Sequence, residues 1–211
     1  MSEVREVDSM EAGRRERGKA EKQTRIRLAA QELFAERGYE AVTTQQVADR
    51  ADIAHGTLFR YAASKAELLL MVHNEVFAAA VTRGEADAAG IADPVERVLT
   101  LIAPVIYSGR DHDENIVAYE RDLLFGPPDA PFRRAGLQIV TRLEASIADC
   151  LAGGGRHDDD TVAAARAVFA VLHMEIAQPV VRADTPGVAS GALRRQVNMI
   201  VAGHRARAQQ D

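Results

Sequence analysis

The feature that most constrains the fold is a row of helix start and stop signals between residues 26 and 69. Apolar residues first recur three and four positions apart, the spacing of one helix face: Ile26, Ala29, Ala30, Leu33 and Phe34. Gly38 then suits the left-handed backbone conformation in which helices commonly end. Thr43 and Gln46, three residues apart, can form a capping box that begins a second helix. These signals predict two helices separated by a short turn.

The same kind of signal continues through a third and a fourth helix. Asp52, a residue type that tolerates the left-handed conformation, marks a turn after the short second helix. His55 to about Tyr61 form a third short helix, and Ser64 with Glu67 caps a long fourth one. A small core is predicted beneath the second and third helices: Val47, Ala51, Ile53 and Leu58. Two short helices crossing over such a core describe a helix-turn-helix, whose second helix enters the major groove of DNA.

The remaining two thirds of the chain also carries helical patterns and no strand alternation. The segment 161–178 is apolar almost all round, so it must be covered on more than one side. A second apolar stripe runs along 193–204, and two such helices from each of two subunits would form a four-helix bundle about a two-fold axis. We therefore predict an all-α fold: a disordered arm at 1–19, a three-helix helix-turn-helix domain at 20–66, and a larger helical domain at 67–211.

Basic residues are concentrated near the N-terminus, although the chain is acidic overall with a net charge of −5. Residues 13–27 carry seven basic side chains and two acidic ones. Such an asymmetry is a weak indication of an end that faces nucleic acid, and a solvated tail is the other interpretation.

Several classes of protein are disfavoured by what the sequence lacks. The single cysteine, Cys150, rules out an intramolecular disulfide framework and suits a reducing cytoplasm. The N-terminus has no apolar signal segment, and no apolar run approaches the roughly 20 residues that span a membrane. A nucleophile elbow, a glycine-rich phosphate loop and metal-ligand spacing are also missing. We expect a cytoplasmic protein that is not an enzyme and that requires no metal and no cofactor.

Residues 24–69 resemble the N-terminal DNA-binding domain of the TetR family of bacterial transcriptional regulators. Four signals carry the resemblance, in the right order: RGY ending the first helix, TT opening the second, GTL in the third and SK-x-x-L opening the fourth. The resemblance implies a repressor that binds a palindromic operator as a homodimer, is released by a small-molecule ligand, and is nucleoid-associated when bound to DNA. The larger domain would then serve ligand binding and dimerisation. The alternative is a helical ligand-binding or interaction protein with weakened DNA binding.

Carried onto this sequence residue by residue, the resemblance implies a set of DNA-binding residues: Thr44, Gln45, Gln46, His55, Gly56, Thr57, Phe59, Arg60, Tyr61 and Lys65. Thr44 and Lys65 would contact phosphates, and Gln45 and His55 would read base edges. His55 as a bystander and Lys65 as a solvated lysine are the alternatives.

Two departures from the family pattern bear on this surface. Phe59 has no hydroxyl where the family often has tyrosine, so a phosphate hydrogen bond is lost or is made by Arg60 or Tyr61. Ala54 stands where a serine N-cap is usual, and losing such a cap typically costs about 1 kcal/mol. Both departures indicate altered phosphate contacts.

Ligand-binding candidates are aromatic or polar residues on otherwise apolar helices of the larger domain: Tyr107, Phe125, Phe132, Phe169, His173 and Glu175. A mostly apolar site with a few orienting polar groups would have such a lining. For the phenylalanines the alternative is ordinary core packing, and for Glu175 it is a salt bridge to an arginine. The ligand is expected to be partly apolar.

Overall fold

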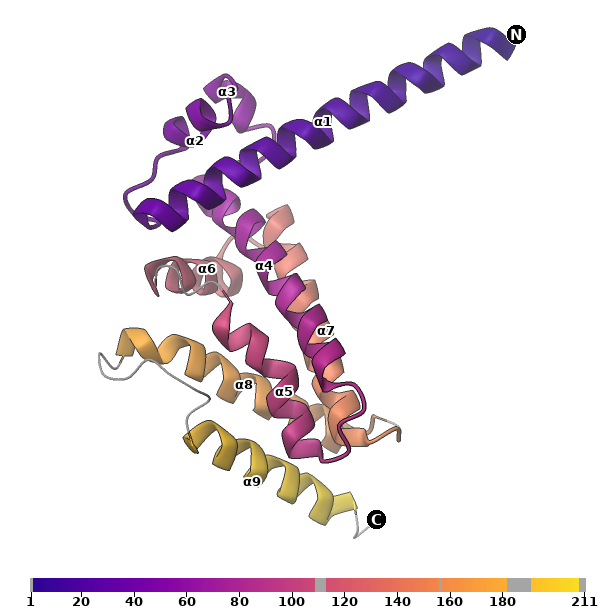
Figure 1. The fold of residues 1–211 in the computed structure, drawn as a ribbon, viewed down its shortest axis with the longest axis vertical. Helices are drawn as coiled ribbons and strands as arrows, with labels where there is room; N and C mark the ends of the chain where they lie inside the picture. Colours follow the sequence, from indigo (N-terminus) through magenta and orange to yellow (C-terminus); the bar gives the residue numbers. More distant parts are fainter. Residues whose placement is uncertain (1, 109–112, 156, 182–190, 209–211) are drawn as a thin grey trace. The chain divides into compact units, whose positions relative to one another are not determined.

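The computed structural model describes residues 2–108, 113–155, 157–181 and 191–208, and within these ranges it contains α-helices and no β-strand (Figure 1). Its helices are, in chain order, α1 (Ser2–Arg37), α2 (Thr44–Arg50), α3 (His55–Leu58), α4 (Lys65–Ala88), α5 (Pro94–Tyr107), α6 (Asp113–Phe125), α7 (Pro131–Ala152), α8 (Asp159–Val181) and α9 (Gly191–Ala208). They form two compact units, Met1–Val72 and His73–Asp211. The predicted all-α class, with a helix-turn-helix followed by a larger helical part, is confirmed. None of the helices described is both long and apolar enough to cross a membrane.

Helix α1 begins at Ser2, where composition predicted an arm without regular structure over residues 1–19 (Figure 1). Residue 1 lies outside the described residues. Glutamate and arginine are the commonest residues of this stretch, and both have good helix propensity, which explains how the backbone continues as helix. At the other end, Gly38 has a φ of 76° and its N–H donates to the Phe34 carbonyl at 3.0 Å, so α1 ends as predicted.

The short helices follow the capping signals closely. The Gln46 backbone N–H donates to the Thr43 hydroxyl at 3.2 Å, and the Thr43 N–H donates to the Gln46 side chain at 2.9 Å, which confirms the capping box of α2. Asp52 takes a φ of 52°, as the turn requires. Helix α3 ends at Leu58 and is shorter than predicted, and its N-cap, Ala54, makes no side-chain cap bond.

The core of the first unit is built from the residues whose spacing predicted it. Of the four residues predicted for this small core, Val47, Ala51 and Leu58 are buried. Ile53, predicted to belong to this core, is only half-buried. Arg50 ties the surface above this core by ion pairs to Glu32 and Glu36 of α1.

The second unit packs the rest of α4 with α5 to α9 around a continuous apolar core (Figure 1). Helices α7, α8 and α9 follow one another side by side, and α8 also contacts α5 and α6. This arrangement covers α8 on several sides, as its nearly uniform apolarity requires.

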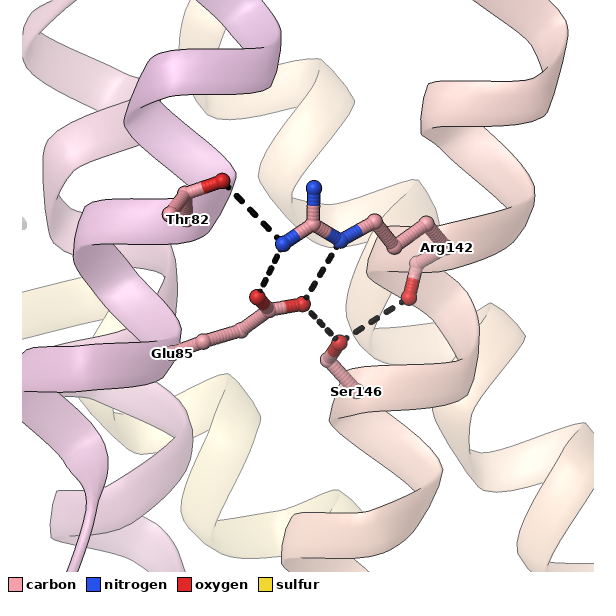
Figure 2. Close-up of polar contacts among 4 residues, drawn as sticks. All are labelled: Thr82, Glu85, Arg142 and Ser146. Atoms are coloured by element: carbon pink, nitrogen blue, oxygen red, sulfur yellow. Dashed lines mark hydrogen bonds and ion pairs between the residues drawn. The ribbon is translucent and has the colours of Figure 1, made fainter.

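Two contacts fix α4 in the second unit. A Cβ on Gly84 would lie 2.0 Å from the Leu101 carbonyl oxygen, so α4 and α5 approach as closely as glycine allows. On another side, the Arg142 guanidinium of α7 binds the Glu85 carboxylate and donates to the Thr82 hydroxyl at 3.1 Å, while Ser146 donates to Glu85 at 2.7 Å (Figure 2). The hydrogen bonds from Arg142 hold the pKa of Glu85 below its ordinary value.

Candidate functional site

The ten predicted DNA-binding residues lie on α2, α3, the turn after α3 and the first residue of α4, all within the first unit. Gln45, Gly56, Phe59 and Arg60 are exposed, and the others are half-buried. A Cβ at Gly56 would meet no atom within 4 Å, so the N-terminal turn of α3 is open to a large partner. Their roles stay predictions, and of these residues the structure brings Thr44, His55 and Phe59 into contact with one another.

A hydrogen bond between α2 and α3 organises this surface in a way the sequence did not predict. The Thr44 hydroxyl and His55 Nε2 are 2.9 Å apart. The His55 ring also meets the edge of Phe59, with ring centroids 4.9 Å apart. His55 is therefore positioned by two neighbours, and a phosphate contact by Thr44 would share its hydroxyl with the imidazole.

Three other side chains have partners that restrict their predicted roles. Lys65 Nζ donates to the carbonyls of Tyr39 at 2.8 Å and Glu40 at 3.3 Å, and it lies 4.2 Å from the centre of the Tyr39 ring. One ammonium proton then remains for a phosphate. Gln46 uses its side-chain oxygen in the capping box, and Gln45 donates to Asp49 at 2.7 Å. A contact between Gln45 and a base edge would require this bond to exchange.

A cavity of about 70 Å³ lies in the second unit, lined by residues of α4 to α8 and by Ser108. This is room for roughly five water molecules, so a larger ligand has to displace side chains. Its wall is mostly aliphatic and aromatic, and the polar residues in it are His73, Ser108, Tyr119, Glu120 and His173. A concave, mostly apolar site with few polar groups is typical of small-molecule binding.

Of the six predicted ligand residues, Phe169 and His173 line this cavity and four do not. Tyr107 lines a second, more open depression, and Phe125 is 82% exposed at the end of α6. Phe132 contributes its backbone carbonyl to a hydrogen bond instead. Glu175 follows His173 by two positions, which turns it to another side of α8.

Sequence reasoning missed the polar residues that α4 and α6 bring to the cavity. Asn74 donates to the Phe132 carbonyl at 2.7 Å and accepts from the Tyr119 hydroxyl at 2.9 Å. Burial raises the pKa of Tyr119. Glu120 Oε1 lies 3.3 Å from His173 Nδ1.

Burial favours the uncharged forms of both Glu120 and His173. It raises the pKa of Glu120 to about 7 and lowers the pKa of His173, so each group is held towards its uncharged form.

One feature of the sequence could have identified Glu120 as a cavity residue. It falls on the apolar face of α6 made by Ile116, Tyr119, Leu123 and Leu124, where an ionisable residue is out of place.

The chain is similar to known proteins both in its N-terminal domain and over a longer part of its length. A family model described as bacterial regulatory proteins, tetR family, matches residues 26–72. The chain is 29% identical over 139 residues to the HTH-type transcriptional repressor KstR of Mycobacterium tuberculosis, covering 66% of this chain and 62% of KstR. The aligned part thus spans less than two thirds of that relative.

Solved structures resemble the whole fold. A TetR-family transcriptional regulator from Streptomyces coelicolor, SCO4454, has a TM-score of 0.63 at 19% identity, covering 87% of this chain and 96% of that one. FadR of Thermus thermophilus, a transcriptional repressor in complex with lauroyl-CoA, has a TM-score of 0.61 at 22% identity, covering 86% and 92%. At such identities the likeness concerns the fold.

Proposed function

Because this chain belongs to the TetR family of bacterial regulatory proteins, we propose that it is a DNA-binding transcriptional regulator controlled by a small-molecule ligand. It acts as a repressor that binds a palindromic operator as a homodimer and leaves it when the ligand binds. The observation that carries this proposal is the helix-turn-helix itself, with an open α3 N-terminus inside the segment that matches the family model.

On DNA, α3 enters the major groove, with Gly56 and Thr57 closest to the bases. His55, positioned by Thr44 and Phe59, and Gln45 read base edges. Arg60, which is exposed, contacts phosphate in place of the hydroxyl that Phe59 lacks.

The ligand acts through α4. This helix starts with Lys65 beside α3 in the chain and supplies His73, Val76 and Phe77 to the cavity. A ligand larger than the present cavity displaces these side chains and favours another position of α4. Ligand binding and operator binding then oppose each other through one coupling free energy. FadR of Thermus thermophilus, which has a similar fold, is in complex with lauroyl-CoA, and this supports a ligand-binding role for a fold of this kind.

Dimerisation supplies the second helix-turn-helix. Large apolar side chains are exposed on α8 and α9, namely Val162, Met174 and Met199, which is 72% exposed. Pairing these helices with those of a second copy covers that surface about a two-fold axis. Two half-sites about one helical turn apart are then bound together.

Selection of bound sequences from random DNA tests the proposal. We expect an enriched palindrome whose affinity for the full-length protein falls steeply between 50 and 200 mM salt, because several phosphate contacts release counterions. The charge-removing variant Arg60→Ala should flatten the salt dependence, while Arg166→Ala on α8 should not. Absence of enrichment, together with no DNA binding at low salt, would favour the alternative of a ligand-binding protein that has lost DNA recognition.

A further inference from the structure

The cavity lined by α4 to α8 offers a bound molecule an apolar wall and very little positive charge. Among its described lining residues there is no lysine or arginine. Ser108 donates its hydroxyl proton to the Val105 carbonyl at 2.9 Å. The hydrogen bonds still available therefore depend on how Tyr119, Glu120 and the histidines are committed.

The Tyr119 hydroxyl already donates its proton in a hydrogen bond to the Asn74 side chain. The Asn74 side-chain nitrogen faces the Phe132 carbonyl at 2.7 Å, because a carbonyl can only accept. That leaves the Asn74 oxygen facing Tyr119 at 2.9 Å, so the tyrosine hydroxyl must be the donor in this contact. Towards a ligand, Tyr119 retains an acceptor lone pair and no proton.

Glu120 and His173 also present acceptors at slightly alkaline pH. Above its pKa of about 7 the Glu120 carboxyl is ionised and can only accept. The neutral His173 then directs its Nδ1 proton to Glu120 Oε1 at 3.3 Å, which leaves Nε2 as an acceptor. The Glu120 side chain is 15% exposed, so little solvent is present to screen its charge.

We propose that the cavity selects an apolar alcohol, with its hydroxyl donating a hydrogen bond to Glu120, and excludes the corresponding carboxylate. The inference deepens the proposed function, since it names the ligand class of the same cavity. A carboxylate would bring a second negative charge next to Glu120 without a cation in the described lining, and an unpaired buried charge is costly. A hydroxyl supplies the donor that Tyr119, Glu120 and His173 do not offer in this arrangement.

Binding of two matched probes, 1-decanol and decanoate, to the full-length protein at pH 8 tests this inference. The chain contains no tryptophan, so Leu124→Trp in the cavity wall gives a single fluorescent reporter of occupancy. Leu124 is 40% exposed, which leaves room for the larger ring. We expect decanol to bind at least about tenfold more tightly than decanoate, a difference of roughly 1.4 kcal/mol. Leu28→Trp on α1 is the control reporter and should not respond.

Removing the charge of Glu120 distinguishes its effect on ligand preference from that of the rest of the cavity wall. In Glu120→Gln with the same reporter, the amide oxygen still accepts but carries no charge, so the preference for decanol should fall below about threefold. Circular dichroism checks that the variant is folded, and isothermal titration calorimetry on the chain without the reporter repeats the wild-type comparison.

Equal or tighter binding of decanoate to the wild-type cavity, or binding of neither probe, would overturn the proposal. These measurements contain no DNA. A wrong ligand class therefore leaves operator binding intact, whereas a failure of the proposed function shows up as absent operator binding.

Discussion

At the scale of single residues, Glu120 makes the folded state sensitive to pH. Burial raises the pKa of its carboxyl to about 7 from an ordinary value of 4.5. Between these two values the folded chain holds a proton that the unfolded chain has released. The free energy of unfolding therefore decreases as the pH rises from about 4.5 through about 7. His173 acts in the opposite direction, because burial lowers its pKa and stability is lost as the pH falls below about 6.5.

We predict that Glu120→Gln removes the alkaline loss of stability. The wild type should lose up to about 3 kcal/mol relative to this variant between pH 5 and pH 8, since each pKa unit corresponds to about 1.4 kcal/mol. Urea unfolding at several pH values measures the difference. Glu114→Gln, an exposed carboxyl on the same helix, is the matched control and should follow the wild-type curve. Parallel curves for wild type and Glu120→Gln would contradict a buried carboxyl at this position.

Single residues also explain why the proposed DNA surface differs in detail from its sequence-based description. Lys65 was predicted to reach phosphate directly, yet its ammonium is directed to two backbone carbonyls and the Tyr39 ring. Tyr39 precedes Lys65 by 26 positions, so no local sequence pattern predicts the contact between them. The same holds for Thr44 and His55, which lie 11 positions apart.

At the scale of helices, the position of α4 depends on one residue without a side chain. Gly84 lies where any Cβ would meet the backbone of α5, and backbone cannot move aside as a flexible side chain can. The nearby Glu85–Arg142 interaction ties the same turn of α4 to α7 (Figure 2). Close approach on one side and a polar contact on the other hold this C-terminal turn of α4 against α5 and α7.

We predict that Gly84→Ala destabilises the protein by more than about 2 kcal/mol, because the added methyl overpacks a rigid contact. Gly203→Ala is the matched control inside α9, where a Cβ would meet nothing within 4 Å. That change should stabilise by about 0.5–1 kcal/mol, the usual gain when alanine replaces glycine in a helix. Thermal unfolding followed by circular dichroism compares the two. A neutral Gly84→Ala would show that α4 and α5 are less tightly packed than described.

At the scale of the whole molecule, the proposed function requires two copies of the chain. In that proposal, the copies meet at the apolar residues left exposed on α8 and α9. Met199 is 72% exposed and has no polar group to stabilise it in water. In the proposed function, dimerisation would place two helix-turn-helix elements on one operator, so dimer stability and DNA affinity would depend on each other.

We predict that Met199→Glu weakens the dimer and, with it, operator binding. The variant places two like charges near the proposed two-fold axis and loses apolar burial. The dimer dissociation constant should therefore rise at least tenfold, which corresponds to roughly 1.4 kcal/mol. Sedimentation velocity over a range of concentrations measures the shift, and fluorescence anisotropy with the selected operator measures DNA affinity. Ala145→Glu, an exposed position on α7, carries the same charge change as a control. An unchanged dimer in Met199→Glu would place the interface elsewhere.

The helices after residue 19 and the helix-turn-helix could be predicted from local sequence alone. Their signals are local, since a capping box such as Thr43–Gln46 or a left-handed turn at Asp52 involves residues within four positions of one another. Local hydrogen bonds and backbone sterics favour these features without contacts from distant parts of the chain.

Contacts between distant segments of the chain decide which polar groups face the cavity and which candidates do not. Asn74 meets Tyr119 across 45 positions of sequence, and Glu120 meets His173 across the packing of α6 on α8. Phe125 and Glu175 are also aromatic or polar residues on otherwise apolar helices. Their positions around these helices place them outside the cavity lining. Periodicity shows that a helix has an apolar face, whereas the packing of helices decides which neighbour that face meets and which groups lose their water.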